Sequence, residues 1–153
     1  MERRPAVIRR LIIVAAALLL GAASSASRAG ETVVLIVSSA SPVVHLETIE
    51  VRKLFLGLTV IRDELPLRAL ANQSDDRLHE VFLQNVIGMP EAAYERRLLM
   101  VALQQGARRP RVYTNTAELL NAVAVDPSAV SFARIEDVAN DRRLRILRIL
   151  WRD

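Results

Sequence analysis

The sequence predicts an α/β domain with a mainly parallel or mixed sheet flanked by helices. Stretches with strand character alternate along the chain with stretches of helical periodicity, and this order is typical of α/β folds. The first stretch, "TVVLIV" at 32–37, is a continuous apolar and largely β-branched run, as expected of a strand buried on both faces. We find no internal repeat and no low-complexity linker, so we expect a single domain.

The first half of this domain contains a second predicted strand and two predicted helices. The segment 46–57 has apolar residues near helical spacing and ends at Gly57, a residue suited to a helix C-terminus. The segment 64–71 is a predicted strand, and its Pro66 indicates an edge position or a strand start. A helix is expected at about 75–87, where the chain then breaks at Gly-Met-Pro.

The second half continues the alternation. A longer helix is expected at 91–106, a short strand at 110–114 and a helix at 117–125, which the sequence Asp-Pro-Ser ends. Two strands, at 129–135 and 144–149, are expected to close the sheet.

The last of these segments has two interpretations. As a strand, 144–149 alternates so that Arg145 and Arg148 lie on opposite faces, which suits an edge strand. As a helix, Arg145, Arg148 and Arg152 share one side, a pattern that could rest on an anionic membrane surface. We favour the strand because a closing strand completes the sheet.

The N-terminus has the order of features found in a secretory signal. "MERRPAVIRR" is basic, an apolar run follows, and "SSASRAG" supplies small residues for cleavage. We therefore predict a signal peptide at 1–29, a mature domain at 30–153 and a periplasmic location. An uncleaved anchor is the alternative, although membrane-spanning helices usually need about 20 apolar residues.

Charge and cysteine content exclude several classes of function. Residues 1–29 contain five of the 21 basic and one of the 17 acidic side chains, so 16 of each sign remain in the domain. The alkaline isoelectric point thus reflects the targeting segment, and we predict no nucleic-acid partner. The chain has no cysteine, which excludes disulfides, thiolate metal sites and a cysteine nucleophile.

Five polar residues, "NQSDD" at 72–76, precede the helix predicted at 75–87, and we call them the collar. A helix N-terminus with a serine hydroxyl and free backbone N–H groups is suited to an anion. Asp75 and Asp76 stand where an anion would bind, and each carboxylate stabilises a helix start by about 0.3–1 kcal/mol. The pattern favours helix capping, with an anion pocket as the alternative.

Four segments together resemble the small, single-domain members of the phosphate-type substrate-binding proteins of ABC importers, which have the type 2 periplasmic binding protein fold. The resemblance covers most of residues 32–138. "RKLFLG" and "AVAVDPSAVSFA" are its most specific parts. The four segments, in order, are "SASPVVHLETIEVRKLFLG", "FLQNVIG", "GARRPRV" and "TAELLNAVAVDPSAVSFA".

This resemblance implies that hydroxyl groups and backbone amides hold a small oxyanion such as phosphate. In the family, a Ser-Gly-Thr type sequence often precedes the third helix, and only Ser74 of the collar matches it, since Asp75 replaces the glycine. Ser131 also replaces a residue that is usually glycine. The match therefore implies a shallow or degenerate site.

Three further candidates come from the residues themselves. Ser39 and Ser41 follow the first strand, at the edge where open α/β sheets place ligands, although serine is also a common turn former. Arg77 could hold an anion through two hydrogen bonds, or it could form a solvated ion pair. With Ser74 and Ser131, these are the predicted ligand-binding residues.

No residue pattern indicates a metal, a cofactor or catalysis. His45 and His79 are far apart in the sequence and lack the ligand spacing of a zinc site. No Gly-rich phosphate loop, nucleophile elbow or His-centred triad occurs. We therefore predict that the protein is not an enzyme and has no cofactor.

Two functions remain. The first is an exported solute-binding protein that resembles the phosphate-binding component of an ABC importer and binds a small oxyanion, with an inner-membrane transporter or sensor as partner. Such importers usually hold their ligand between two lobes, and about 120 mature residues suit only one lobe. The alternative is a periplasmic interaction or sensory-accessory protein that has the same fold and a degenerate ligand site.

Overall fold

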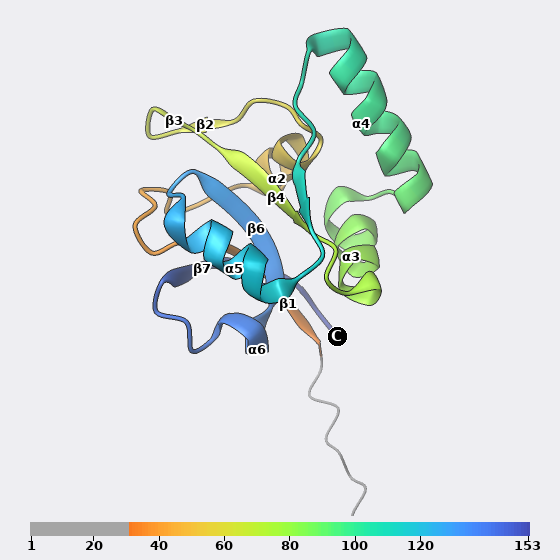
Figure 1. The fold of residues 1–153 in the computed structure, drawn as a ribbon. Coiled ribbons are helices and arrows are strands. Elements are labelled where there is room, and N and C mark those ends of the chain that lie inside the picture. Colours follow the sequence, from red (N-terminus) through yellow and green to blue (C-terminus); the bar gives the residue numbers. More distant parts are fainter. Residues whose placement is uncertain (1–30) are drawn as a thin grey trace, which may run out of the picture.

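The computed structural model describes residues 31–153 and shows an α/β fold (Figure 1). The predicted signal peptide lies outside the described residues. The predicted fold class is confirmed, because a five-stranded mixed sheet is flanked by helices. In chain order the elements are β1 (Thr32–Ser38), α2 (Thr48–Phe55), β2 (Ile61–Arg62), β3 (Leu65–Pro66), β4 (Arg68–Asn72), α3 (Asp76–Phe82), the π-helical turn η1 (Leu83–Ile87), α4 (Glu91–Gln105), β5 (Arg111–Tyr113), α5 (Thr116–Val125), β6 (Ala129–Arg134), α6 (Ile135–Val138) and β7 (Leu144–Arg152).

The main sheet has the strand order β5-β4-β6-β1-β7. β4 runs parallel to both β5 and β6, whereas β1 runs antiparallel to β6 and β7. Four strands therefore point one way and β1 points the other. As a consequence, the C-terminal end of β1 lies at one end of the sheet, and the C-terminal ends of β4 and β6 lie at the other.

β1 is the centre of the core, and all seven of its residues are buried. Val33, Leu35 and Val37 pack on one face of the sheet with residues of α2 and α3. Val34 and Ile36 pack on the other face with residues of α5. The apolar run thus forms a strand buried on both faces, as predicted, because helices cover the sheet on both sides.

An aromatic cluster joins the sheet to the helices on the first face. Phe82 of α3 stacks on Phe132 of β6 with ring centroids 3.7 Å apart. Phe55 of α2 meets both rings edge-on, at 4.8 and 5.7 Å. The Tyr94 hydroxyl of α4 donates a 2.6 Å hydrogen bond to the Phe55 carbonyl. These contacts hold the end of α3 against the sheet and the start of α4 against α2.

The C-terminal segment forms an edge strand, β7, so the strand interpretation is confirmed and the helical alternative is wrong. The expected alternation is also wrong, because two bulges shift the pairing with β1. Arg145 pairs opposite Val37 and Arg148 opposite Leu35. Both arginines therefore lie on the same face, where they donate to backbone carbonyls of the segment 41–46.

The strand expected at 64–71 is divided in two. β2 and β3 form a small hairpin, and β4 begins only after it. The hairpin turn is formed by Asp63 and Glu64, which have φ angles of 50° and 63°. Two consecutive left-handed residues close a two-residue hairpin, although this turn usually contains glycine or asparagine. The missing glycine explains why the sequence did not reveal the turn.

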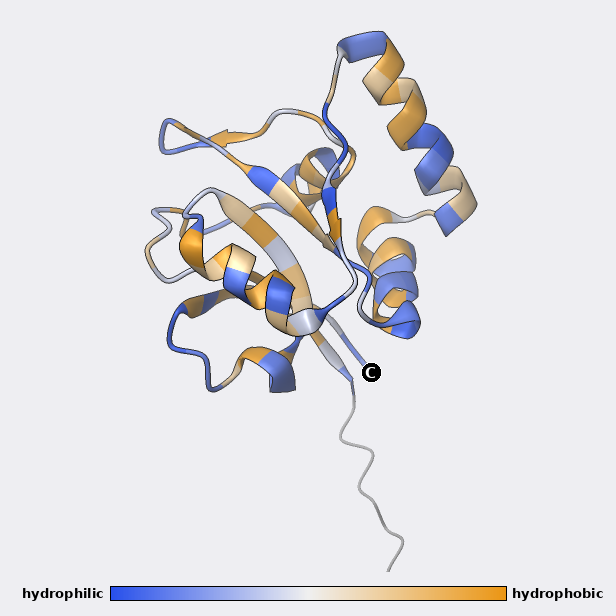
Figure 2. Ribbon diagram, viewed as in Figure 1, coloured by the Kyte–Doolittle hydropathy of each residue, from blue (hydrophilic) through white to orange (hydrophobic). Residues whose placement is uncertain are grey.

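The helix expected at 75–87 is present as α3 followed by the wider turn η1, and Gly88 ends it with φ of 83°. α4 extends away from the sheet and carries apolar residues along its length (Figures 1 and 2). None of the helices within 31–153 combines the length and apolar character needed to cross a bilayer.

Candidate functional site

The collar lies at the end of β4, where the chain enters α3, and its polar groups bond to one another. The side chain of Asn72 is fully buried and donates to the Phe132 carbonyl at 2.9 Å. Its Oδ1 atom accepts hydrogen bonds from the backbone N–H and the hydroxyl of Ser74. The Thr116 hydroxyl, at the start of α5, donates to Ser74 Oγ at 2.9 Å. Ser74 therefore connects the starts of two helices.

Asp75 is the N-cap of α3 and accepts a 2.8 Å hydrogen bond from the Leu78 amide. Its carboxylate also forms a 2.9 Å ion pair with the Arg134 guanidinium. The Leu78 amide and then Arg134 hold the pKa of Asp75 below its usual range, although burial opposes them. The capping interpretation of the collar is thus confirmed for Asp75, while Ser74 bonds elsewhere.

The ion pair of Asp75 belongs to a larger network. Arg134 donates to Glu31 Oε1 at 2.9 Å, and Arg77 donates to Glu31 Oε2 at 3.0 Å. Two carboxylates and two guanidinium groups therefore neutralise each other beside the collar. Of the two roles that the sequence allowed for Arg77, the structure shows the solvated ion pair: it pairs with Glu31, and its side chain is 67% exposed.

The other predicted site residues lie away from the collar. Ser39 and Ser41 follow β1, and because β1 is antiparallel they lie at the opposite sheet edge from Ser74. Ser41 is buried and accepts from the Val43 amide, as a turn residue does. Ser131 is fully buried, and its hydroxyl donates to the Leu70 carbonyl. The fold therefore places neither Ser39 nor Ser41 beside Ser74, and Ser131 lies within the sheet.

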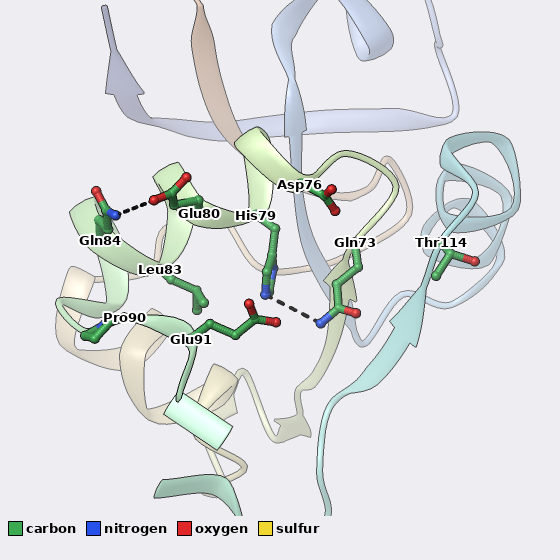
Figure 3. Close-up of a pocket in the computed structure, with 9 residues that line it drawn as sticks. All are labelled: Gln73, Asp76, His79, Glu80, Leu83, Gln84, Pro90, Glu91 and Thr114. Atoms are coloured by element: carbon green, nitrogen blue, oxygen red, sulfur yellow. Dashed lines mark hydrogen bonds between the residues drawn. The ribbon is translucent and has the colours of Figure 1, made fainter. Parts of the chain in front are cut away.

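A pocket of about 560 Å³ lies beside the collar, between α3 with the following turn η1 and the start of α4 (Figure 3). No group of His, Asp and Glu side chains within the described part of the chain is arranged to hold a metal ion. The side chains around the pocket are mostly polar and include three carboxylates. The lining residues are Gln73, Asp76, His79, Glu80, Leu83, Gln84, Pro90, Glu91 and Thr114.

Sequence reasoning did not identify this pocket. One signal was present, because Asp76, His79 and Glu80 are spaced to lie on one face of a helix. Glu91 comes from the start of α4 and Thr114 from the segment after β5, and only the folded chain brings them to α3. The collar and the pocket are the two candidate sites at this end of the sheet.

Searches for similar proteins found the fold but no close relative. No protein-family model matches the chain, and no curated protein matches it. Three solved structures match 78% of this chain. They are described as a phosphate ABC transporter substrate-binding protein with bound phosphate from Clostridium perfringens (13% identity, TM-score 0.57), a possible phosphate binding protein from Planctomyces limnophilus (11%, 0.54) and PstS from Borrelia burgdorferi (11%, 0.55).

The chain matches only part of each of these solved structures. The chain covers 45%, 41% and 47% of these three structures, in the same order. It therefore spans less than half the length of each. Its mixed sheet and flanking helices resemble one lobe of a periplasmic binding protein.

Proposed function

We propose that the chain is an exported, non-catalytic binding domain whose oxyanion position is filled by its own Asp75 carboxylate, and that it acts through contact with another protein. The donors around Asp75 carry this proposal. A helix amide and an arginine are groups that bind anions. Here the Leu78 amide and the Arg134 guanidinium both donate to Asp75 instead.

Electrostatics supports this assignment. An external phosphate would have to displace Asp75 from the start of α3, and it would then meet Asp76 in the first helical turn. Like charges in close proximity disfavour the charged form of a ligand or side chain. The collar is therefore better suited to holding α3 in place than to binding a dianion.

The surface of α4 supports contact with another protein. Leu99, Met100 and Leu103 are exposed on this helix, Leu103 by 77%. Apolar groups gathered on one exposed face are typical of interaction surfaces. An inner-membrane transporter or sensor is the class of partner implied by the resemblance to importer components.

Binding of a small oxyanion is the second candidate function. It is supported by the structure from Clostridium perfringens, which contains bound phosphate. Of the predicted ligand-binding residues of this chain, Ser74 and Arg77 would contact an oxyanion bound at the collar. Ser39, Ser41 and Ser131 would take part only through a different arrangement of the chain.

Replacing Asp75 by glycine tests which candidate is right. Glycine is tolerated at an N-cap at a cost of only a few tenths of a kcal/mol. It leaves the Leu78 amide without its acceptor and leaves Arg134 with Glu31 as its remaining carboxylate. We expect phosphate or acetate to stabilise Asp75→Gly in a thermal shift assay and to leave the wild type unchanged. Ligand at 100 times Kd would add about 2.7 kcal/mol.

Asn115→Gly is the matched control, because Asn115 is the N-cap of α5 and accepts from the Glu118 amide in the same way. This variant should lose a cap without gaining an anion site. Stabilisation of the wild type by phosphate, abolished by Ser74→Ala, would favour the second candidate instead.

Export and partner contact need separate measurements. Mass spectrometry of a periplasmic extract should find a chain that begins near Gly30, whereas full-length chain found only in membranes would favour the anchor. A photo-reactive residue at Leu103 should give a discrete cross-linked product in intact cells. The same residue at Val125, which is 80% exposed on α5, should not.

A further inference from the structure

The helix α4 is buried along one side only, and it lies away from the sheet (Figure 1). Its buried residues are Tyr94, Leu98 and Val101. They have the i, i+4, i+7 spacing that places residues on one face of a helix. The opposite side of such a helix is usually polar, so the residues on that side of α4 decide whether it only faces solvent.

The outward side of α4 is apolar around one arginine. Four residues with i, i+3, i+4 and i+7 spacing lie opposite to the buried side, and we call them the outer face: Arg96, Leu99, Met100 and Leu103. The three apolar side chains are 54%, 47% and 77% exposed, in chain order. No other helix of 31–153 carries more than one exposed large apolar side chain.

The segment that begins on this face carries only positive charge. Residues 96–117 contain five arginines and no acidic residue. Arg96 and Arg97 form no ion pair within the described chain, whereas Arg109 pairs with Glu95. Water solvates exposed arginines, so their charge alone indicates no partner. Exposed apolar side chains gathered on the same helix face do indicate one, and the charge then determines its sign.

A second pocket, of about 510 Å³, lies at the C-terminal end of α4, and we call it the arginine pocket. Its lining includes the buried side chains of Leu54 and Leu67. All of its charged lining residues are arginines: Arg68, Arg108, Arg109 and Arg111. Arg108 and Arg111 form no ion pair with another described residue. Apolar and basic groups therefore occur together here as well as on the outer face.

We propose that the outer face of α4 docks an acidic segment of another protein, with apolar side chains between its carboxylates. The inference rests on the proposed function and adds the chemistry of the partner. Apolar side chains of the partner cover Leu99, Met100 and Leu103, and a carboxylate pairs with Arg96 through charge-assisted hydrogen bonds. At the end of the helix, the arginine pocket accepts an apolar side chain that lies next to a carboxylate, as an anchor residue does.

Two other occupants fit this face less well. In a symmetric contact, a second copy would bring Arg96 and Arg97 against the same two residues, and like charges across an interface are unfavourable. A membrane surface would meet Arg96 in the middle of the apolar face, because this residue lies between Leu103 and Met100 around the helix axis. Helices that lie on membranes keep their basic residues on the polar side instead.

Peptide binding to the purified protein tests the sign of the partner's charge. The probe is a labelled, helix-forming peptide with leucine at i, i+3, i+4 and i+7 and glutamate at the flanking positions. Its two analogues carry glutamine or lysine in place of glutamate. In fluorescence anisotropy we expect saturable binding of the glutamate peptide, weakened by added salt, and weaker binding of both analogues. Equal binding of the three peptides, or binding of none, would overturn the proposal.

Vesicles of phosphatidylglycerol are the probe for the membrane alternative. We expect the protein to stay in the supernatant when such vesicles are sedimented. Sedimentation with the vesicles that is lost in Leu103→Ser would assign the outer face to a membrane surface and overturn the acidic partner.

Two pairs of variants locate the binding of the glutamate peptide. Arg96→Glu is compared with Arg142→Glu, which makes the same change in net charge at an exposed arginine outside α4. Leu103→Ser is compared with Val125→Ser, at an exposed position of α5. Both α4 variants should raise Kd about ten-fold or more, and both controls should leave it unchanged, with the fold checked by circular dichroism. An unchanged Kd in either α4 variant would contradict docking on the outer face.

Cross-linking in intact cells separates this inference from the proposed function. The photo-reactive residue at Leu103 is combined with Arg96→Glu, and we expect its cross-linked product to decrease strongly. A product that persists undiminished would leave the proposed function standing and show that the partner is not acidic. Without any product in the background that retains Arg96, the proposed contact with another protein itself is wrong.

Discussion

The collar and the pocket are adjacent and both are rich in polar residues, yet they differ in how their charges are paired. In the collar, Asp75 meets a backbone amide and Arg134, and the Ser74 hydroxyl has a donor and an acceptor within the chain. In the pocket, the exposed carboxylates of Glu91 and Asp76 have no basic partner from 31–153.

This difference separates polar groups that are paired within the chain from polar groups that are exposed. A buried polar group that is fully paired stabilises the fold, and removing one partner is costly. The carboxylates of Asp76, Glu80 and Glu91 are exposed, so water solvates them and they need no partner within the chain. The polar groups of the collar therefore stabilise the fold, whereas the carboxylates of the pocket face solvent.

Removing residues 143–153 should have the largest effect, because it deletes the edge strand β7 and uncovers β1 at the centre of the core. β7 pairs along the whole of β1, and Leu147, Leu150 and Trp151 pack against the core. We expect the truncated chain to lose its cooperative thermal transition or to aggregate. A truncated chain that stays folded, by circular dichroism and denaturant titration, would show that collar and pocket do not depend on this strand.

Asp75→Ala should be the most damaging single change in the comparison. It removes the N-cap of α3, a loss that costs about 0.5–2 kcal/mol, and it takes one of the two carboxylates from Arg134. We expect a value near the top of this range in urea unfolding. A loss below about 0.5 kcal/mol would mean that the collar is not a stabilising structure.

Ser74→Ala should have a smaller effect. It removes hydrogen bonds between neutral groups, each worth about 0.5–1.5 kcal/mol net, while the cap on Asp75 stays. The measured loss should be less than that of Asp75→Ala under the same conditions. A larger loss of stability in Ser74→Ala than in Asp75→Ala would mean that Ser74 caps α3.

Glu91→Gln should hardly change stability, because the carboxylate forms no ion pair with any residue of 31–153. We expect a change within about 0.5 kcal/mol, and a small gain is consistent with less repulsion from Asp76 and Glu80. A loss as large as that of Asp75→Ala would remove the distinction between the two regions.

The pH dependence should show the smallest effect. Burial lowers the folded-state pKa of His79, while Glu91, a backbone hydrogen bond with Asn72, Glu95 and Asp76 oppose this shift. The unfolded chain therefore takes up a proton first, so stability is fully present above about pH 6.5 and falls as the pH drops from there towards the folded pKa. His79→Asn should reduce this loss in urea midpoints, and an unchanged pH dependence would contradict it.

The comparison also shows how far the sequence alone could describe the collar and the pocket. Asp and Ser before a periodic helix predicted a capped start, and the cap is present. Which of Ser74 and Asp75 caps α3 was decided only by the tertiary structure, because both side chains can accept a hydrogen bond from a helix amide. The pocket is not visible in the sequence, since Glu91 and Thr114 come from elements that the sequence does not place beside α3.

The sequence by itself determined the α/β class, the buried first strand and the order of the helices, because hydrophobic periodicity and caps are local properties of the chain. Tertiary structure decided the direction of β1, the bulges of β7 and the hairpin at 61–66. Periodicity is the same for either strand direction, and a bulge changes the face of every residue after it. For that reason Ser39 and Ser41 lie opposite to the collar, and Arg145 and Arg148 share one face.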